Sequence, residues 1–455
     1  MSLRLLQYSD IENAYDDPER IGRLAGLIEE LRDETALVVG TGDNTAPGVL
    51  AMVTEAEQAL TFFQAVEPDA ETFGNHDFDF GPKRTRELVQ ASPQPWLCAN
   101  VYDEDDRFGA AEGVVPWTIL EAGTDRVGLF GVIDPKTPSM APAVDNLTFT
   151  DPVAEARTAV AELRNRQVDH IVALSHVGSS DDDLAAALDV DAILGGHIHN
   201  ERLEHRHGTL LTRPGAGGQI LFEITLDENV SATRYDVTDA PIDHPVQAAL
   251  HEQWEQAGLT EVVAHTNASI EWTGASVYEG ECQIGNFVAD AYRWAADSDV
   301  GLQNSGAIRV GPPLTDDVTV GNLASIVPFG APVVVAAVSG VELCELFRQG
   351  DSALVELGDA TRWYAHISGA EIVYDHAERS LAEATVDGKP IDPERTYSVA
   401  TSEYLLQTDL EFPILTPAHR TQTLDTQYEI LAAYAREHGI NPQLEGRITR
   451  HGRSW

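Results

Sequence analysis

The chain has 455 residues, 43% of them hydrophobic, and a formal net charge of −45. This length exceeds one ordinary hydrophobic core and predicts two or three domains. The acidic balance argues against nucleic acid and anionic membrane as partners, because both carry charge of the same sign.

Two further features of the composition bear on location and environment. No apolar run reaches the ~20 residues of a membrane helix, and no basic stretch followed by an apolar core opens the chain, which predicts a cytoplasmic protein. Lysine occurs only at positions 83, 136 and 389. An acidic, lysine-poor composition resembles cytoplasmic proteins of extreme halophiles, since a Debye length of about 3 Å at 1 M salt makes acidic self-repulsion tolerable. Three separated cysteines (Cys98, Cys282 and Cys344) predict neither a disulfide framework nor a zinc finger.

The first part of the chain, residues 1–237, alternates strand-like and helical patterns. The predicted strands are 3–9, 35–43, 96–101, 126–133, 170–177 and 190–199, with helices at 18–33 and 152–166 and a hairpin-like segment at 208–226. Such alternation predicts an α/β layered domain. Its functional residues are expected at the carboxyl ends of the strands.

The second part is separated from the first by residues 238–262, which are predicted to form a linker with one helix. Residues 263–455 then form a second α/β domain. Its predicted strands are 300–306, 332–340, 370–375 and 396–406.

Two carboxylates, Asp10 and Glu12, stand two residues apart at the end of the first predicted strand. Alternate residues of a strand share a face, so the two charges should lie side by side. Like charges that close are destabilising unless a cation or a hydrogen-bond network receives them. The pair therefore predicts either a solvated acidic strand end or a cation site.

Four more strand ends in the first domain carry polar side chains. They are Asp43; then Asn75, His76, Asp77 and Asp79; then His176; and finally His197 with His199. A single histidine after a strand is more often a capping or surface residue than a ligand. Together, however, carboxylate, amide and imidazole groups at five strand ends are the mixture that binds two divalent cations.

The order of these motifs resembles that of the calcineurin-like metallophosphoesterases: Asp-x-ligand, Gly-Asp, Gly-Asn-His-Asp, His and Gly-Gly-His-x-His. The segments "GECQIGNFVADAY", "LQNSGAIRVG" and "NLASIVPFG" resemble the C-terminal domain of the 5′-nucleotidase and UDP-sugar hydrolase family. The resemblance implies a four-layer α/β/β/α sandwich followed by an α/β substrate-binding domain.

The resemblance also implies a ligand set for two metals. One metal would be held by Asp10, Asp43 and His199, with Glu12 completing the site, and the second by Asp43, Asn75, His176 and His197. A bridging Asp43 would hold the cations ~3.5–4 Å apart, with a hydroxide between them as the nucleophile. His76 matches the family's catalytic histidine and Asp79 its partner, whereas Asp77 is given a structural role.

In the second domain, Asn304 and Arg309 match family residues that contact the nucleoside. Phe329 matches one of two aromatic residues that stack on the base, although ordinary core packing explains a lone phenylalanine equally well. Tyr404 is the candidate for the second aromatic residue, and Asp409 is the candidate for contact with the ribose.

Three departures from the family pattern stand out. Position 12 is Glu where the family has His, the segment "YEGEC" lacks an arginine, and "LLQTDLEFP" replaces a glycine-rich stretch. Oxygen ligands suit manganese and magnesium, whereas imidazole suits zinc. The sequence therefore predicts two divalent ions with manganese preferred and zinc, magnesium, cobalt and iron as alternatives.

The resemblance implies a hydrolase that removes phosphate from nucleoside 5′-monophosphates or related nucleotides. The alternative within the enzyme class is a cyclic-nucleotide or nucleotide-sugar phosphodiesterase. A nucleotide-binding regulator with a decayed site is the alternative outside it, and the complete ligand set argues against decay. A purely structural metal site is disfavoured as well, because such a site is normally closed by four ligands rather than spread over five loops. The partner is a small-molecule nucleotide, and the sequence leaves the oligomeric state open.

Overall fold

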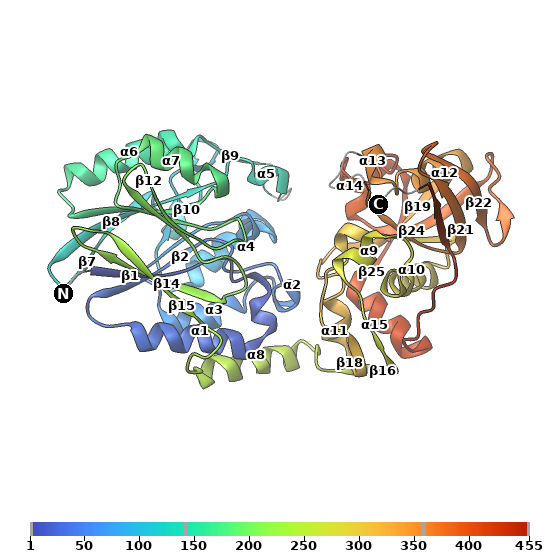
Figure 1. The fold of residues 1–455 in the computed structure, drawn as a ribbon, viewed down its shortest axis with the longest axis horizontal. Coiled ribbons are helices and arrows are strands. Elements are labelled where there is room, and N and C mark those ends of the chain that lie inside the picture. Colours follow the sequence, from blue (N-terminus) through green and yellow to red (C-terminus); the bar gives the residue numbers. More distant parts are fainter. Residues whose placement is uncertain (1–2, 141–143, 145, 356–360, 453–455) are drawn as a thin grey trace. The chain divides into compact units, whose positions relative to one another are not determined.

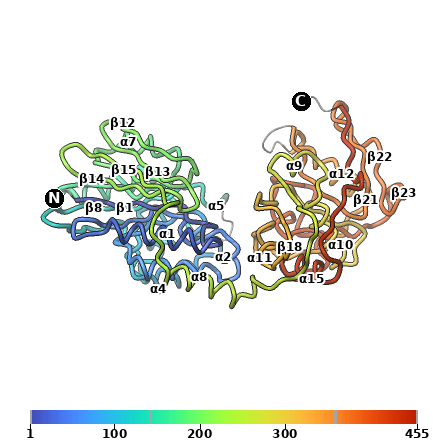
Figure 2. Tube along the Cα trace, turned by 60° about the horizontal axis from the view of Figure 1, so that its bottom comes forward, coloured from blue at the N-terminus to red at the C-terminus, as the bar shows by residue number. Residues whose placement is uncertain are grey.

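The computed structural model describes residues 3–140, 144, 146–355 and 361–452. The chain divides into two compact units, Met1–Ala257 and Gly258–Trp455. It passes from the first to the second between α8 (His244–Gln256) and β16 (Val262–Ile270), as Figure 2 shows. This division falls within the segment 238–262.

The first unit contains two six-stranded mixed sheets (Figure 1). The first sheet has the order β15 (Ser231–Asp236), β14 (Ile220–Leu226), β1 (Leu3–Tyr8), β2 (Ala36–Thr41), β3 (Ala70–Thr72) and β4 (Trp96–Leu97). The second has the order β12 (Arg202–Arg206), β13 (Thr209–Arg213), β11 (Ala192–Gly195), β10 (His170–His176), β8 (Asp125–Ile133) and β7 (Trp117–Ala122). A small third sheet has the order β6 (Asp106–Arg107), β5 (Val101–Asp103) and β9 (Leu147–Phe149).

The two large sheets pack face to face and helices cover their outer faces. Helices α6 (Pro152–Asn165) and α7 (Asp181–Ala187) lie on one side, and α1 (Pro18–Leu31), α3 (Ala59–Val66) and α8 lie on the other (Figure 1). Further helices among the described residues of this unit are α2 (Val49–Thr54), α4 (Gly81–Ala91) and α5 (Thr137–Met140). The predicted α/β/β/α order of layers is confirmed.

Alternation along the strands divides the core into layers. In β8, Leu129 packs with Leu174 in the cluster between the sheets. The next residue, Phe130, joins the cluster that includes Leu163 of α6. Because both faces of a central strand are covered, such strands read as continuous apolar runs rather than alternating ones.

A glutamine joins the two sheets at the polar end of this core. The Gln7 amide donates to the Gly195 carbonyl at 3.0 Å and accepts from the Thr212 hydroxyl at 2.6 Å. Gln7 is fully buried, so these bonds satisfy a group that would otherwise be costly to bury. They fix the strand ends β1, β11 and β13 relative to one another.

Three helices of the first unit begin at an aspartate followed by proline one or two residues later. Asp17, Asp151 and Asp243 accept hydrogen bonds from the main-chain N–H groups of Arg20, Val153 and Val246 at 3.2, 2.9 and 3.0 Å. These bonds satisfy N–H groups that have no partner within the helix, and proline tolerates the first turn. The starts of α1 and α6 therefore follow directly from the sequence.

Helix α1 packs closely against the segment that leads into α8. At Gly26 a Cβ atom would lie 2.2 Å from the Pro241 carbonyl oxygen, and at Gly22 it would lie 3.0 Å from the Asp243 carbonyl oxygen. The main chains touch only because neither residue has a side chain. This packing makes α8 part of the first unit.

Among the predicted elements of this unit, the hairpin and one strand are wrong, and the strand expected over 190–199 ends at Gly195. The segment 208–226 does not form a hairpin, because β13 and β14 belong to different sheets. Their true hairpin partners are β12 and β15, and the connection 214–219 crosses the sandwich. The predicted strand 96–101 is interrupted after Leu97, since Cys98 and Ala99 bond to the carbonyls of Val115 and Gly131 on separate segments.

The second unit is also mixed α/β, as predicted. Its five-stranded sheet has the order β20 (Ala365–Ser368), β17 (Val300–Asn304), β24 (Thr396–Ser402), β19 (Pro332–Ser339) and β25 (Arg420–Thr426). A four-stranded sheet contains β23 (Lys389–Pro390), β22 (Ser380–Val386), β21 (Ala370–Asp375) and β26 (Ile448–His451), and β16 pairs with β18 (Leu314–Thr319). The helices are α9 (Gly274–Tyr278), α10 (Gln283–Ala296), α11 (Val320–Ala324), α12 (Gly340–Arg348), α13 (Ser352–Val355), α14 (Tyr404–Gln407) and α15 (Gln427–His438).

One predicted strand of this unit is too long. The strand expected over 396–406 ends at Ser402, and Tyr404 begins the short helix α14. Leu405 and Leu406 are buried in the same core as the strand residues before them. An apolar run of this length does not distinguish a strand from one turn of helix.

We predict that Gly26→Ala destabilises the first unit. The new methyl group would meet the Pro241 carbonyl at 2.2 Å, and overpacking of this kind costs ~1–3 kcal/mol. That loss exceeds the gain of about 1 kcal/mol from replacing glycine by alanine in a helix. Thermal unfolding should therefore show a lower Tm. Glu29→Ala, on the exposed side of α1, is the control and should change stability by less than about 0.5 kcal/mol; an unchanged Tm for Gly26→Ala would contradict the packing.

Candidate dinuclear metal centre

The polar residues predicted from the sequence gather at one end of the sandwich. Strands β1, β2 and β3 run parallel in the first sheet, and β8, β10 and β11 run parallel in the second. Parallel strands present their carboxyl ends at the same edge, where open α/β sheets build sites. Ligand-type side chains follow these strands from both sheets, and bonds between them join the sheets.

One group of potential ligands consists of Asp43, His176 and His197, each offering an atom within 4.8 Å of the others. The closest contact is between His176 Nε2 and Asp43 Oδ2, at 3.0 Å. His176 Nδ1 lies 2.7 Å from the Thr41 carbonyl oxygen and can only donate to it. This bond leaves Nε2 as the nitrogen with a free lone pair, the form of histidine that binds metals.

A second group consists of Asp10, Glu12 and His199, by the same distance criterion. Glu12 Oε1 lies 2.8 Å from His199 Nε2. Asp10 accepts a hydrogen bond from the His197 main-chain N–H at 3.0 Å and another from the Ser9 hydroxyl. Asp10 and Glu12 are buried, whereas His199 is exposed, so this group opens to solvent on one side.

The two groups are adjacent. Glu12 of one and Asp43 of the other belong, together with His76, to a third group within the same 4.8 Å limit. Carboxylates from both groups therefore lie close enough to contact two neighbouring cations. Dinuclear hydrolase sites hold their ions ~3.5–4 Å apart.

Among the residues that the structure describes, three buried polar atoms at this place find no hydrogen-bond partner: Glu12 Oε1, Asn75 Oδ1 and His176 Nε2. The short contacts of Glu12 with His199 and of His176 with Asp43 lack the geometry of hydrogen bonds. Buried polar atoms are normally satisfied, so each exception requires an explanation. An oxygen or nitrogen lone pair left free in this way fits a divalent cation, and the donor set suits one.

Four of these potential ligands have left-handed backbone angles, a feature that the sequence did not predict. Asp10, Glu12, Asp43 and His197 have φ angles of 48°, 50°, 54° and 74°, in the left-handed region that costs non-glycine residues roughly 1–2 kcal/mol. The prediction that Asp10 and Glu12 share the face of a strand is wrong, because β1 ends at Tyr8. The two side chains converge through strained loop geometry instead, a common feature of functional sites.

Two glycines allow the loops to approach one another. A Cβ atom at Gly74 would lie 2.1 Å from Asp43 Oδ1, and one at Gly196 would lie 2.5 Å from Ser9 Oγ. Any side chain at either position would displace a neighbouring loop. These glycines therefore explain the Gly-Asn and Gly-His parts of the motifs.

The ionisable groups of the centre shift one another strongly. Burial raises the pKa of Asp10 to about 7. Burial acts in the same direction on Asp43, but the charges of His176 and His76 outweigh it and hold the pKa of Asp43 at about 2. Burial lowers the pKa of His176, and the Asp43 carboxylate more than reverses this effect, to about 10. The centre thus has a strong negative potential that favours bound positive charge.

His76 lies beside these ligands and is itself oriented by a carboxylate. Its Nδ1 lies 3.0 Å from Asp79 Oδ2, and its main-chain N–H donates to Asp43 Oδ1 at 2.7 Å. Its neighbour Asp77 accepts four hydrogen bonds, from the N–H groups of Asp43, Gly74 and Thr45 and from the Thr45 hydroxyl. Asp77 therefore ties the loops after β2 and β3 together.

The sequence reasoning missed Asp134, which follows β8. Asp134 Oδ2 lies 3.6 Å from His197 Nε2, and the Asp134 main-chain N–H donates to the His176 carbonyl at 2.9 Å. The only signal in the sequence was an aspartate directly after the apolar run "VGLFGVI". The same signal had identified Asp43.

In the second unit, three of the predicted residues make polar or ring contacts and a fourth is exposed. The Arg309 guanidinium lies 4.9 Å from the centre of the Phe329 ring. Asn304 is buried, and its amide donates to the Glu411 carboxylate at 3.0 and 3.2 Å. Tyr404 is 40% exposed.

The candidate Asp409 is exposed, whereas Glu411, two residues later, is buried. Burial raises the pKa of Glu411, and Asn304 and Arg309 oppose the rise. Glu411 rather than Asp409 therefore lies with Asn304. The sequence offered both acids in "TDLEF", and nothing in that stretch distinguished them.

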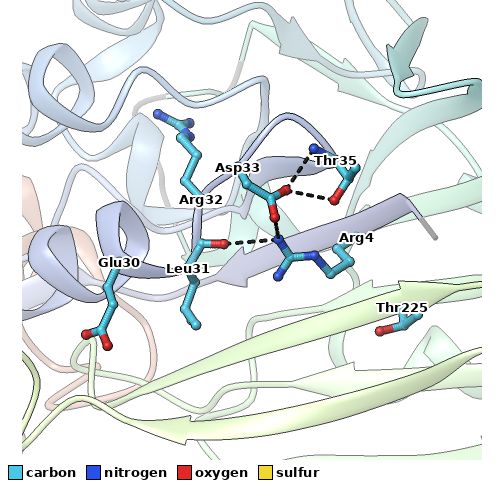
Figure 3. A pocket seen from close by; sticks show the side chains of 7 residues that line it. All are labelled: Arg4, Glu30, Leu31, Arg32, Asp33, Thr35 and Thr225. Atoms are coloured by element: carbon cyan, nitrogen blue, oxygen red, sulfur yellow. Dashed lines mark hydrogen bonds and ion pairs between the residues drawn. The ribbon is translucent and has the colours of Figure 1, made fainter. Parts of the chain in front are cut away.

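A separate pocket lies at the other end of β1 and is not part of this centre. It has a volume of about 580 Å³ and is lined by Arg4, Glu30, Leu31, Arg32, Asp33, Thr35 and Thr225 (Figure 3). Arg4 pairs with Asp33 at 2.7 Å and donates to the Leu31 carbonyl (Figure 3). It also pairs with Glu223. These bonds leave the arginine charge balanced within the protein.

Comparison with known families identifies both units. The family described as "Calcineurin-like phosphoesterase" matches residues 3–201, and "5'-nucleotidase, C-terminal domain" matches residues 262–417. The two matches together cover more than half of the chain. The protein belongs to the calcineurin-like phosphoesterases that have a 5′-nucleotidase C-terminal domain, a class of hydrolases that act on phosphoric esters of nucleotides with two divalent metal ions.

Individual relatives are distant but extend over nearly the whole chain. The Trifunctional nucleotide phosphoesterase protein YfkN of Bacillus subtilis is 25% identical over 98% of this chain, which spans only 35% of the length of that relative. A 5′-nucleotidase of Diplobatis ommata is 23% identical, with 92% of this chain and 83% of the relative covered. The structure of a 5′-nucleotidase precursor from Thermus thermophilus shares the fold, with a TM-score of 0.74 and 23% identity over 99% of both chains.

Within the part of the chain that the structure describes, no helix is both long and apolar enough to cross a membrane. The cytoplasmic location stays a prediction from the sequence.

We predict that Glu12→Ala lowers the affinity for divalent metal by at least about tenfold, because loss of residues that merely support a ligand already costs 10–100-fold. Glu12→His should restore binding and move the preference from manganese toward zinc. Isothermal titration of metal-free protein with each ion measures both effects. Glu104→Ala, in an exposed turn, is the control. Unchanged manganese affinity in Glu12→Ala would show that Glu12 is not a ligand.

Proposed function

We propose that this protein removes phosphate from nucleoside 5′-monophosphates or closely related nucleotides. The supporting observation is the pair of adjacent ligand groups, in which buried atoms of Glu12 and His176 have no hydrogen-bond partner. Family membership supplies the reaction class. The proposal adds the substrate and the roles of individual residues.

Seven side chains are proposed to hold the two cations. They are Asp10, Glu12, Asp43, Asn75, His176, His197 and His199. Asp43 would be the bridging ligand, because its carboxylate lies in the group with His176 and His197 and also within 4.8 Å of Glu12, a member of the other ligand group. Two divalent ions, when bound, supply Lewis acidity that activates water and offsets phosphate charge.

His76 is proposed to act on the phosphate or on the leaving group. Asp79 occupies its Nδ1 at 3.0 Å, so Nε2–H is the atom available to a substrate. A hydrogen bond from this atom can stabilise a phosphoryl oxygen, and its proton can pass to the departing alkoxide. The carboxylate orients the ring and favours its cationic form.

Asp134 is proposed to orient His197. With Nε2 in an ion pair with Asp134 at 3.6 Å, Nδ1 would be the nitrogen left for a cation. Carboxylates that bond to the outer nitrogen of a metal-binding histidine fix both its tautomer and its orientation.

The second unit is proposed to bind the nucleoside. The face of Phe329 offers a stacking surface for any base, and Arg309, which lies over that ring, would move aside or extend the stack. The Glu411 carboxylate, held by Asn304, is suited to accept hydrogen bonds from ribose hydroxyls. Tyr404 is kept as the second aromatic residue, whereas the exposed Asp409 is the weaker candidate for the ribose.

The metal is proposed to be manganese. Four of the seven ligands, including Glu12, present oxygen, and carboxylate oxygen favours manganese or magnesium over zinc. The imidazole groups of His176, His197 and His199 favour manganese over magnesium.

A nucleotide phosphodiesterase is the second candidate. The dinuclear centre can act on a monoester or a diester, and one relative is named as a trifunctional nucleotide phosphoesterase. The segment "YEGEC" also lacks an arginine that would favour a doubly charged terminal phosphate.

Phosphate release from a nucleotide panel tests the function. With Mn²⁺ in 2 M KCl, nucleoside 5′-monophosphates should be hydrolysed faster than 3′-monophosphates, cyclic nucleotides or nucleotide sugars. His76→Ala should lower kcat by about 10²-fold or more, since general acid catalysis contributes 10²–10⁴-fold, while metal content stays unchanged.

The control for this experiment is His265→Ala, because His265 is an exposed histidine of the second unit. Faster hydrolysis of diesters would favour the second candidate. Tight binding of nucleotides with no hydrolysis of any, and with His76→Ala indistinguishable from wild type, would instead indicate a regulator.

We also propose that the protein works in concentrated salt, and we predict that its Tm rises between 0.1 and 2 M KCl. The net charge of −45 creates self-repulsion that salt screens, since the Debye length falls from about 10 Å at 0.1 M to about 3 Å at 1 M. Sucrose at equal osmolality is the control, because it favours compact states without screening charge. A Tm that is the same in KCl and in sucrose would contradict the proposal.

A further inference from the structure

Close to the candidate metal centre, a tyrosine of β1 and a glutamate of β3 bond to each other across the strand between them, β2. Tyr8 of β1 pairs in register with Gly40 of β2, and Gly40 pairs with Glu71 of β3. A Cβ atom at Gly40 would lie 2.1 Å from both carboxyl oxygens of Glu71. The glycine in the middle strand therefore makes room for a carboxyl group in the core.

The Glu71 carboxyl group is fully buried and contacts two polar side chains. The Tyr8 hydroxyl donates to Oε2 at 2.6 Å, and the Asn44 amide donates to Oε1 at 2.8 Å. Burial raises the pKa of Glu71 to about 8, although hydrogen bonds from Tyr8, Asn44 and the Gly42 main chain oppose this rise. A buried acid is expensive to retain for stability alone, yet the roles assigned above do not use it.

Asn44 connects Glu71 to the loop that contains Asp10, Ile11 and Glu12. Its Oδ1 accepts a hydrogen bond from the Ile11 main-chain N–H at 3.2 Å, and its main-chain carbonyl accepts one from the Tyr15 hydroxyl at 2.9 Å. An asparagine amide has one accepting and one donating end. Because Glu71 takes the donating end, the accepting end must face Ile11.

The loop that receives this bond needs external support. Asp10 and Glu12 both have left-handed φ angles, and Ile11 between them is right-handed. The N–H groups of Asp10 and Glu12 donate to the carbonyls of Gly42 and Asp43 at 3.0 and 3.2 Å. Of these three successive N–H groups, only that of Ile11 depends on a side chain.

We propose that Glu71 is a positioning residue for the metal centre. By fixing the orientation of the Asn44 amide, it holds Ile11 and thereby sets where Asp10 and Glu12 direct their carboxylates. This inference rests on the proposed role of these two residues as ligands. The test measures Mn²⁺ binding rather than hydrolysis. A wild-type protein that binds Mn²⁺ but releases no phosphate from any nucleotide would refute the proposed function and leave this inference intact.

The test compares two substitutions of Glu71 in the full chain. Glu71→Gln keeps an oxygen for Asn44 and can donate to the Tyr8 hydroxyl, so Mn²⁺ affinity should stay within about threefold of wild type. Glu71→Leu removes the acceptor, and affinity should fall by about tenfold or more, the range found for residues that support metal ligands. Isothermal titration with Mn²⁺ measures affinity, and thermal unfolding identifies the folded variants.

The control is Thr72→Val, in the same strand, which removes a buried hydrogen bond from Thr72 to the Leu97 carbonyl without touching the loop. Its Mn²⁺ affinity should be unchanged. Asn44→Ala should lower affinity as Glu71→Leu does, and the double variant should be no weaker than Asn44→Ala alone, because the two residues act in series. If Glu71→Leu does not fold, Asn44→Ala tests the same link. Wild-type affinity in a folded Glu71→Leu or Asn44→Ala variant, or equal losses in Glu71→Gln and Glu71→Leu, would overturn the proposal.

Discussion

The centre depends on positive charge that compensates for the repulsion among three carboxylates, which the fold holds close together in its interior. Asp10, Glu12 and Asp43 are buried, and members of this set lie within 4.8 Å of one another in overlapping groups. Like charges at such distances destabilise a folded protein unless positive charge compensates for them. Histidines supply part of that compensation, and divalent cations are suited to supply the rest. The strained loops and the glycines at tight contacts bring these charged groups together.

Much of this arrangement could be predicted from the sequence. The Asp-Pro starts of α1 and α6, the apolar runs of the central strands and the polar residue after each strand are local signals with direct physical causes. They yield the layered fold and gather Asp43, His176 and His197 at one edge. What they do not contain is the pairing of distant strands. The segment 208–226 has the pattern of a hairpin, yet its two strands belong to different sheets, because tertiary packing rather than turn chemistry decides their partners.

The details of the site were less predictable for a similar reason. Asp10 and Glu12 meet because both have left-handed backbone angles, and a sequence gives no indication of such strain for residues other than glycine. Asp134 and Glu411 are single acids whose surroundings come from remote segments. Glu71 lies in β3, a strand that was not predicted, and only the register of three strands shows that Gly40 makes room for it. Burial and partner identity are properties of the fold, so residues that act through others are the last to be found.

The central claim is that Asp43 bridges two metal ions held by these loops. Electron paramagnetic resonance of the metal-free protein titrated with Mn²⁺ tests it most directly, since ions ~3.5–4 Å apart with a shared carboxylate are magnetically coupled. The account predicts binding of two ions per chain with the spectrum of a coupled pair, and loss of the coupling in Asp43→Asn. One ion per chain, or two ions with uncoupled spectra, would contradict it.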